Sequence, residues 1–344
     1  YPDWETLPYD VYSPHQDIIS ERLSTLYQLP QVKHGLLILP AISLLQRVPP
    51  TGYLDQQAFI AKVGDRLDIN ALRARLERSG YSYVSQVLEH GEFAVRGSLI
   101  DLYPMGHAQP YRIDLFDDEI ESIRDFDPDT QLSANKHQDI RLLPAREFPL
   151  HEQAISEFRG RWRDRFAGDP QSCVVYKDVS NGLAPAGVEY YLPLFFSETA
   201  SLFDYLPKQT LILQTSAADN INEHFWEQLA QRHEQRRHNT ERPILEPDEL
   251  YLRPKDSKLA LAAYPHIQLQ SFEAPETLSH KHNFAARQPG SLQLQVKEQD
   301  PSARLRLFVE TCQKNILFIA ESAGRRENLL ELLRGINIQP QQIQ

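Results

Sequence analysis

Residues 91–126 constrain the fold most strongly, because their side chains alternate with the two-residue period of β-strands. The first expected strand turns Phe93 and Val95 to one face and Arg96 to the other. The second alternates between two sets, Tyr111, Ile113 and Leu115 on one face and Arg112, Asp114 and Phe116 on the other. Arginine and aromatic residues are enriched at binding hot spots. The pattern alone leaves two interpretations equally open, a docking face and a solvated sheet face with one stray aromatic residue.

Length and composition predict a soluble globular chain with several domains. Because 344 residues exceed one ordinary core, we expect roughly two to four domains, and 41% hydrophobic residues is an ordinary content. No apolar run approaches ~18 residues, so no membrane span is expected. The start resembles no signal peptide and lacks Met, which suggests an excised piece of a longer protein. Cys173 and Cys312 lie far apart, which favours a reducing cytoplasm, and the net charge of −11 argues against a wide nucleic-acid surface.

Strand and helix signals alternate along the chain, which is typical of layered α/β folds. Residues 13–28 show helical spacing after a Ser-Pro start, and residues 36–39 form an apolar run that predicts a buried parallel strand. Residues 42–48 predict a further helix. We therefore expect residues 1–57 to form part of a doubly wound domain whose beginning is missing.

A compact α+β module is expected over residues 58–140, inserted between two parts of the larger domain. Asp68 can cap a helix over residues 71–78. The two alternating strands follow, and turns are predicted at residues 117–118 and 127–129.

The layered domain is expected to resume over residues 141–282, and a third small α/β domain is expected to begin within residues 283–344. Further helices are predicted over residues 151–166, 220–238, 301–312 and 324–334, and further strands over residues 210–215 and 315–320. The basic end of the helix at 220–238 is interpreted as a complement to the helix dipole.

No self-contained catalytic constellation is predicted. The sequence has no GxxxxGK[ST] phosphate loop and no HExxH zinc motif, and residues 322–326 (SAGRR) are interpreted as an exposed helix start. His224, His233 and His238 lack the i, i+4 spacing of paired metal ligands, so we interpret them as solvated. We therefore predict no catalytic residue, no metal site and no cofactor site in this chain.

Two motifs, GEFAVRGSLIDLYPMG and PYRIDLFDDEIESIRDFDPDT, closely resemble the second domain of the excision-repair protein UvrB. They are still more similar to the corresponding module of the transcription-repair coupling factor (Mfd) family. The resemblance to this family covers the whole chain, through DWETLPYD and SPHQDIISERLSTLYQLP, then GVEYYLPLFFSE and LFDYLP, and finally ESAGRRENLLELL. It implies an α/β fold with a degenerate RecA-like, UvrB-like layered domain, an inserted small α+β domain and part of a further small α/β domain.

The resemblance also implies a partner for the two alternating strands. In UvrB and the coupling factors this module docks UvrA, the ATPase that loads the excision machinery. The family's binding positions correspond here to Arg96, Arg112 and Phe116. Guanidinium groups pair bidentately with carboxylates, and phenylalanine provides a buried anchor. Asp114 lies between Arg112 and Phe116 on the same face and is unassigned; holding Arg112 in place is one role open to it.

The chain departs from UvrB in one important segment. UvrB carries an aromatic-rich hairpin that grips damaged DNA, between the positions equivalent to Pro8-Tyr9 and Ile18-Ile19. Here only a handful of residues join them, and UvrB's phosphate loop would lie upstream of Tyr1. The resemblance thus implies recruitment without damage verification or ATP hydrolysis. It implies a cytoplasmic parent protein, an ATP- and Mg-dependent DNA translocase whose motor, RNA polymerase and duplex-DNA sites lie beyond Gln344.

Two alternatives remain open. The first is a truncated UvrB-type damage-binding helicase, against which the missing hairpin argues. The second is a purely structural, autoinhibitory clamp, in which the alternating strands pack against the parent's own C-terminal domains. In this family the UvrA-docking face is thought to be masked intramolecularly, so docking and packing can share one surface.

Overall fold

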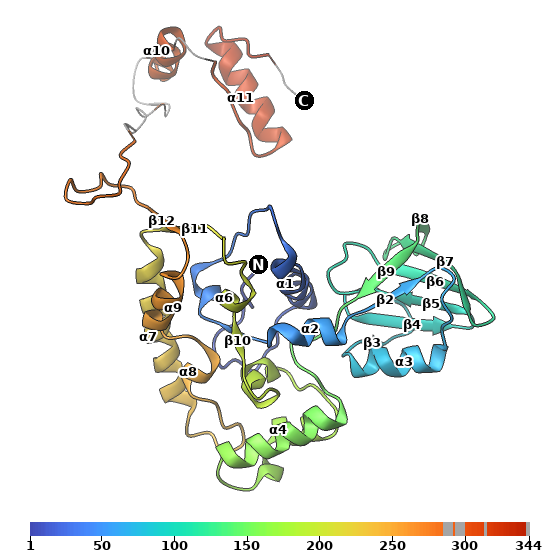
Figure 1. The fold of residues 1–344 in the computed structure, drawn as a ribbon. Coiled ribbons are helices and arrows are strands. Elements are labelled where there is room, and N and C mark those ends of the chain that lie inside the picture. Colours follow the sequence, from blue (N-terminus) through green and yellow to red (C-terminus); the bar gives the residue numbers. More distant parts are fainter. Residues whose placement is uncertain (285–291, 293–299, 313–314, 342–344) are drawn as a thin grey trace. The chain divides into compact units, whose positions relative to one another are not determined.

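The protein folds as a mixed α/β structure, and the predicted fold class is confirmed. The computed structural model describes residues 1–284, 292, 300–312 and 315–341. These fall into two compact units, Tyr1–Ser271 and Phe272–Gln344 (Figure 1). Within the described residues, no helix combines the length and apolar character needed to cross a bilayer.

The inserted module is built on a six-stranded sheet with the strand order β3-β4-β5-β6-β7-β8 (Figure 1). Its strands are β3 (Ser82–Tyr83), β4 (Glu92–Arg96), β5 (Leu99–Leu102), β6 (Tyr111–Phe116), β7 (Glu119–Phe126) and β8 (Ser133–His137). Neighbours from β4 to β8 pair antiparallel, whereas β3 pairs parallel to β4. Antiparallel neighbours need only short connections, which is why one continuous segment forms most of the sheet.

One face of this sheet forms the module's core, against helix α3 (Ile69–Arg78). Asp68 caps α3 as predicted, because its side chain accepts a hydrogen bond from the amide of Ala71 at 2.9 Å. Leu72 and Leu76 of α3 are buried in one apolar cluster with alternate residues of the strands, Phe93, Ile100, Leu102, Ile113, Leu115 and Ile123. Burial of each such side chain contributes about 1.5–3 kcal/mol, so this inner face fixes the strand register.

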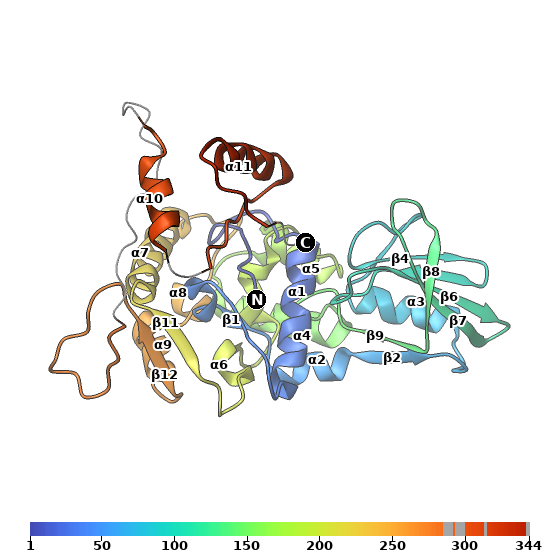
Figure 2. The same ribbon diagram turned by 90° about the horizontal axis from the view of Figure 1, so that it is seen from above.

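A two-stranded antiparallel ribbon carries the chain into and out of the module. β2 (Phe59–Lys62) enters and β9 (Asp139–Leu142) leaves, with Phe59 opposite Leu142 and Lys62 opposite Asp139 (Figure 2). The ribbon ties together two segments about eighty positions apart in sequence, one before and one after the six-stranded sheet.

Among the regular elements in the remainder of the first unit, helices predominate. Its helices are α1 (Gln16–Gln28), α2 (Thr51–Gln57), α4 (Glu152–Arg165), α5 (Val174–Ser180), α6 (Leu202–Tyr205), α7 (Ala218–Arg236), α8 (Pro247–Leu250) and α9 (Pro254–Leu261), and its short strands are β1 (Arg47–Val48), β10 (Ala200–Ser201), β11 (Ile212–Thr215) and β12 (His266–Leu269). Trp162 of α4 lies at the centre of an aromatic cluster, with its ring 5.6 Å from Tyr176 and 5.4 Å from Tyr191. The second unit contains α10 (Ala303–Thr311) and α11 (Ala323–Gly335).

The predicted strand at residues 36–39 is wrong. Leu36 and Ile38 are 79% and 73% exposed, and the segment is irregular. A buried parallel strand requires paired neighbours on both sides. Leu37 and Leu39 pack against the core, but the only hydrogen bond described for this segment runs from the terminal amine of Tyr1 to the carbonyl of Ile38, at 2.9 Å.

The predicted helix at residues 42–48 is also wrong, because tertiary pairing overrides local spacing. A 3₁₀ turn, η2 (Ala41–Leu44), leads into β1, which pairs with β10. Gln46 forms a bridge with Tyr251. The predicted strand at residues 315–320 is likewise irregular in the structure, and it ends at Ser322, whose side chain caps α11.

A buried carboxylate gives the larger domain a testable dependence on pH. Glu189 accepts a hydrogen bond from the hydroxyl of Ser13 at 2.8 Å, and burial raises the pKa of Glu189 from 4.5 to about 7. The folded state therefore binds more protons than the unfolded state between these two values. The free energy of unfolding should fall as pH rises from about 4.5 to about 7 and level off above, by roughly 3 kcal/mol at most.

Urea unfolding of the wild type and of Glu189→Gln at pH 5, 6, 7 and 8 measures this contribution. We expect Glu189→Gln to show a shallower loss of stability with pH than the wild type. The surface variant Glu198→Gln should retain the wild-type slope. Identical slopes in the wild type and Glu189→Gln would contradict the assignment.

Candidate docking site

The sequence-predicted site residues lie on the outer face of the sheet, opposite α3. Arg96 ends β4, Arg112 is the second residue of β6, and Phe116 ends β6. The predicted alternation is confirmed, since Ile113 and Leu115 are buried whereas Phe116 is 75% exposed. The two strands are not neighbours, however, because β5 lies between them.

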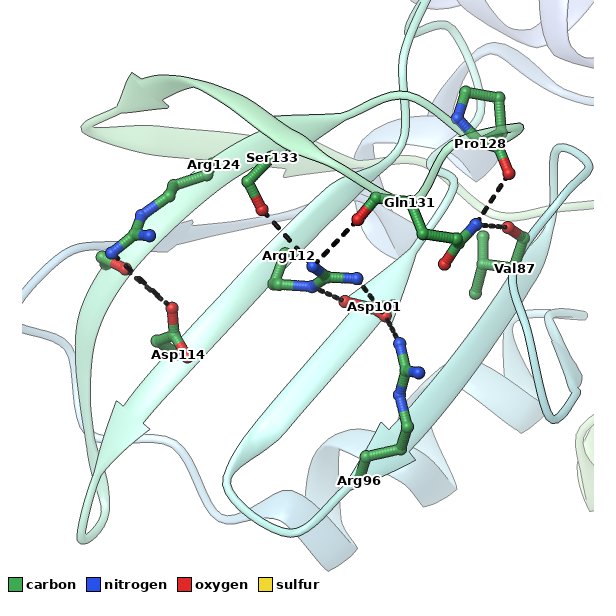
Figure 3. A network of polar contacts seen from close by, with 10 residues as sticks. Val87, Arg96, Asp101, Arg112, Asp114, Arg124, Pro128, Gln131 and Ser133 are labelled. Carbon is green, nitrogen blue, oxygen red and sulfur yellow. Dashed lines mark hydrogen bonds and ion pairs between the residues drawn. The ribbon is translucent and has the colours of Figure 1, made fainter.

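Strand β5 brings a buried carboxylate, Asp101, to the centre of the outer face. Asp101 lies opposite Ala94 on one side and opposite Arg112 on the other. Its side chain is 1% exposed and accepts two hydrogen bonds from Arg112, from Nε at 2.7 Å and from Nη2 at 3.0 Å. Arg96 also donates to the Oδ2 atom of Asp101 (Figure 3). One buried carboxylate therefore orients two arginines that come from different strands.

Arg112 is largely occupied by contacts within the module. Its Nη1 donates to the carbonyl of Gln131 at 3.3 Å, and the guanidinium lies 4.9 Å from the centre of the Phe126 ring. Only 18% of the side chain is exposed. The side-chain hydrogen bond to Asp101 raises the pKa of Arg112, which secures its charged form. Arg112 is thus a structural part of the outer face.

Arg96 and Phe116 have much more exposed surface. The side chain of Arg96 is 49% exposed while it remains bonded to Asp101, so its orientation is restrained without being covered. Phe116 is 75% exposed beside a tight turn in which Asp117 has a φ of 58°. Preorganised arginine and exposed phenylalanine are suited to contact a carboxylate and an apolar pocket on a partner.

A small second core covers another part of the outer face. Val87, Ala94 and Phe126 are buried together, and Tyr103 packs against them. Gln131 fastens the surrounding loops, because its Nε2 donates to the carbonyls of Val87 and Pro128 at 3.2 and 2.7 Å (Figure 3). This part of the outer face is therefore covered by other residues of the module, and only the rest of the face is accessible to a partner.

Asp114 does not hold Arg112 through a direct contact. It accepts a hydrogen bond from the hydroxyl of Ser122 at 3.1 Å and lies 3.9 Å from Nη2 of Arg124. The residue that holds Arg112 is Asp101, which sequence reasoning missed. The sequence signal for Asp101 was its position as the single acid in the apolar segment Leu99–Leu102, because a buried carboxylate needs a cationic partner.

Other polar candidates have structural roles. His233, predicted to be solvated, is buried, with its ring 5.6 Å from that of Tyr9. The basic end of α7 supports a loop, because Arg232 and Arg236 donate to the carbonyls of Pro8 and Tyr9 at 2.7 and 2.6 Å. In the part of the chain that the structure describes, no three His, Cys, Asp or Glu residues gather as metal ligands would.

Comparisons with known proteins match both the module and the whole chain. The model of the UvrB interaction domain matches residues 60–148, and that of the MFD D3 domain matches residues 308–344. The transcription-repair-coupling factor of Haemophilus influenzae is 45% identical over 100% of this chain and 30% of its own length. That of Escherichia coli is 46% identical over 99% of this chain and 30% of its own length. The chain thus spans about a third of the length of these relatives.

The central role of Asp101 can be tested by its removal. Asp101→Ala leaves the two arginines without their shared carboxylate, and the guanidinium of Arg112 is mostly buried. We expect the free energy of unfolding to fall by about 2–4 kcal/mol. Asp114→Ala, which removes a partly exposed and loosely paired acid from the same face, should cost less than about 1 kcal/mol. Chemical denaturation of both variants measures the difference, and equal losses would refute the assignment.

Proposed function

The chain belongs to the transcription-repair-coupling factor family, as its UvrB-like N-terminal region, and on that premise we propose that its six-stranded module binds UvrA. Binding through this module would recruit the excision machinery to stalled RNA polymerase, in the cytoplasm. The observation that carries the proposal is the outer face itself. This face combines the exposed Phe116 with Arg96, whose guanidinium is oriented by the buried carboxylate of Asp101 and remains accessible to a partner.

The three family positions would contribute in different ways. Phe116 is the apolar anchor, and its exposed ring would be buried in a pocket of UvrA. Arg96 offers its unshared guanidinium edge to a carboxylate of UvrA. Arg112 is a positioning residue, since its donors already bind Asp101 and Gln131. It shapes the contact surface by holding Asp101 in place.

We propose that this region itself has no catalytic role and holds no cofactor. ATP and Mg²⁺ would act in the motor domains of the longer protein, which would also bind RNA polymerase and duplex DNA. The parent's own C-terminal domains would mask the UvrA-docking face when recruitment is not required. A UvrB-type helicase is less well supported, because the named relatives that match along the whole chain are coupling factors.

Calorimetric titration of the chain with UvrA tests the proposal. We expect Arg96→Ala and Phe116→Ala each to weaken binding by about 2 kcal/mol, or roughly 30-fold, and to cost less stability than Arg112→Ala. Arg112→Ala should reduce both binding and stability, because it leaves Asp101 half-paired. Arg78→Ala is the matched control, since Arg78 is an exposed arginine on α3 that bonds only to the carbonyl of Ala74 among the contacts described.

The outcomes separate the partner from the residues. Absence of binding by the wild type would refute UvrA as the partner. Equal binding by the wild type and an Arg96/Arg112/Phe116 triple alanine variant that remains folded would refute the site.

Duplex DNA should bind this region weakly. The net charge of −11 opposes phosphate contacts, and residues 10–17 are too few for a damage-gripping hairpin. Fluorescence anisotropy should show binding only at low salt and its loss at moderate salt. Tight, salt-resistant binding that prefers damaged duplex would support a UvrB-type function in place of recruitment.

A further inference from the structure

A third arginine, Arg124 of β7, lies on the same outer face without a role in the family's set of binding positions. The strand register places Arg124 directly opposite Arg112 on one side and opposite Lys136 on the other. Three basic side chains in one cross-strand row repel each other and cost stability. Asp101 neutralises Arg112, so the repulsion that remains is mainly between Arg124 and Lys136.

The guanidinium of Arg124 has unused hydrogen-bonding capacity. Its Nε is buried and has no hydrogen-bond partner among the described residues. Its Nη2 lies 3.9 Å from Oδ2 of Asp114, which is too long for a hydrogen bond, although 39% of the side chain is exposed (Figure 3). Arg112 differs in this respect, because its Nε donates to Asp101 at 2.7 Å. The Nε atom itself is covered, but the exposed edge of this weakly paired guanidinium can donate to a carboxylate supplied from outside.

We propose that Arg124 binds a second carboxylate of the partner, so that this face recognises two acidic side chains. This inference rests on the proposed binding of UvrA. Arg96 on β4 would hold one carboxylate and Arg124 on β7 the other, on either side of the Arg112–Asp101 pair. The two strands are three interstrand spacings apart, or about 14 Å. An acidic surface patch on UvrA, and not a single side chain, is therefore the matching feature.

Asp114 acts on Arg124 as a positioning residue. Its carboxylate is anchored by the hydroxyl of Ser122 and attracts the guanidinium of Arg124 along the sheet. The attraction is weak at 3.9 Å in a partly exposed setting, so a closer partner carboxylate can displace it. Asp114 would then keep Arg124 on the face in the free protein without competing strongly in the complex.

A protein carboxylate fits the face better than a nucleic-acid phosphate. The chain carries a net charge of −11, and Asp117, Asp118 and Glu119 lie at the hairpin end beside Phe116. A continuous phosphate backbone would meet these acids, whereas a folded partner can avoid them.

Titration calorimetry of the chain against UvrA at two salt concentrations tests the inference. We expect Arg124→Ala to weaken binding about tenfold at low salt and to reduce the salt dependence. Arg124→Glu should weaken binding further, and Arg124→Lys, which keeps the charge, should recover part of the loss. Arg78→Ala, which removes an arginine from the opposite side of the sheet, should bind like the wild type.

Asp114→Asn distinguishes a binding role of Arg124 from a structural one. If Asp114 only positions Arg124, Asp114→Asn should change affinity by less than about threefold, while Arg124→Ala still weakens binding. The losses from Arg96→Ala and Arg124→Ala should multiply in the double variant, because the two arginines engage separate carboxylates. Thermal melting of each variant checks the fold. If Arg124→Ala has a lower melting temperature than the wild type, the affinity of Arg124→Lys is compared with that of the wild type instead.

The inference and the proposed function fail in different ways. If Arg124→Ala, Arg124→Glu and the control Arg78→Ala all bind UvrA with the affinity of the wild type, the second contact is refuted. Docking through Arg96 and Phe116 then stands. If the wild type does not bind UvrA, both fail together. If Arg124→Ala abolishes binding to duplex DNA while binding to UvrA is unchanged, the site recognises phosphate and the inference is refuted.

Discussion

A buried ion pair between Arg22 and Glu147 closes the larger domain around its insertion. The two side chains are 0% and 1% exposed, and Nε of Arg22 donates to Oε1 of Glu147 at 2.6 Å. Arg22 lies on α1, before the inserted module, and Glu147 follows it. Arg22 also donates to Gln46 at 2.8 Å and Glu147 accepts from Trp4 at 3.3 Å, so segments distant in sequence converge on one pair. Loss of either partner would leave a buried charge, at a cost of about 3–5 kcal/mol.

The module depends on this closure because α1 also carries its contacts with the larger domain. The hydroxyl of Ser20 accepts a hydrogen bond from the amide of Gly106 at 2.7 Å, and Asp17 pairs with His90 at 2.7 Å. Gly106 has a φ of +81°, and a Cβ atom there would lie 2.8 Å from Oγ of Ser24, so only glycine permits the close approach. The strands β2 and β9 connect the module covalently to the larger domain, and the contacts with α1 hold it in position. The module that carries the docking face is therefore held against α1 of the larger domain.

Local pattern predicted those parts of the fold in which burial follows the chain's own periodicity. The alternation in β6, the Asp68 cap of α3 and the helix beginning at His151 were predicted from sequence for this reason. Residues 36–39 failed because an apolar run does not reveal whether neighbouring strands exist to cover it. β5 was missed because Asp101 interrupts its apolar run. Its burial becomes intelligible only when the register sets it between Ala94 and Arg112, and register is a property of several strands together.

The same limit applies to the candidate site, where sequence motifs supplied residues but not their roles. Arg96 and Arg112 are equivalent in a motif, yet the sheet gives them different tasks because Asp101 bonds Arg112 through two nitrogens and Arg96 through one. An arginine whose donors are already bonded within the module helps to shape the surface. An arginine with exposed, unbonded donors can contact a partner directly. By this criterion Arg124 is closer to Arg96 than to Arg112, because 39% of its side chain is exposed and its nearest carboxylate lies 3.9 Å away. The distribution of hydrogen bonds, more than membership of the motif, identifies which arginines can bind a partner.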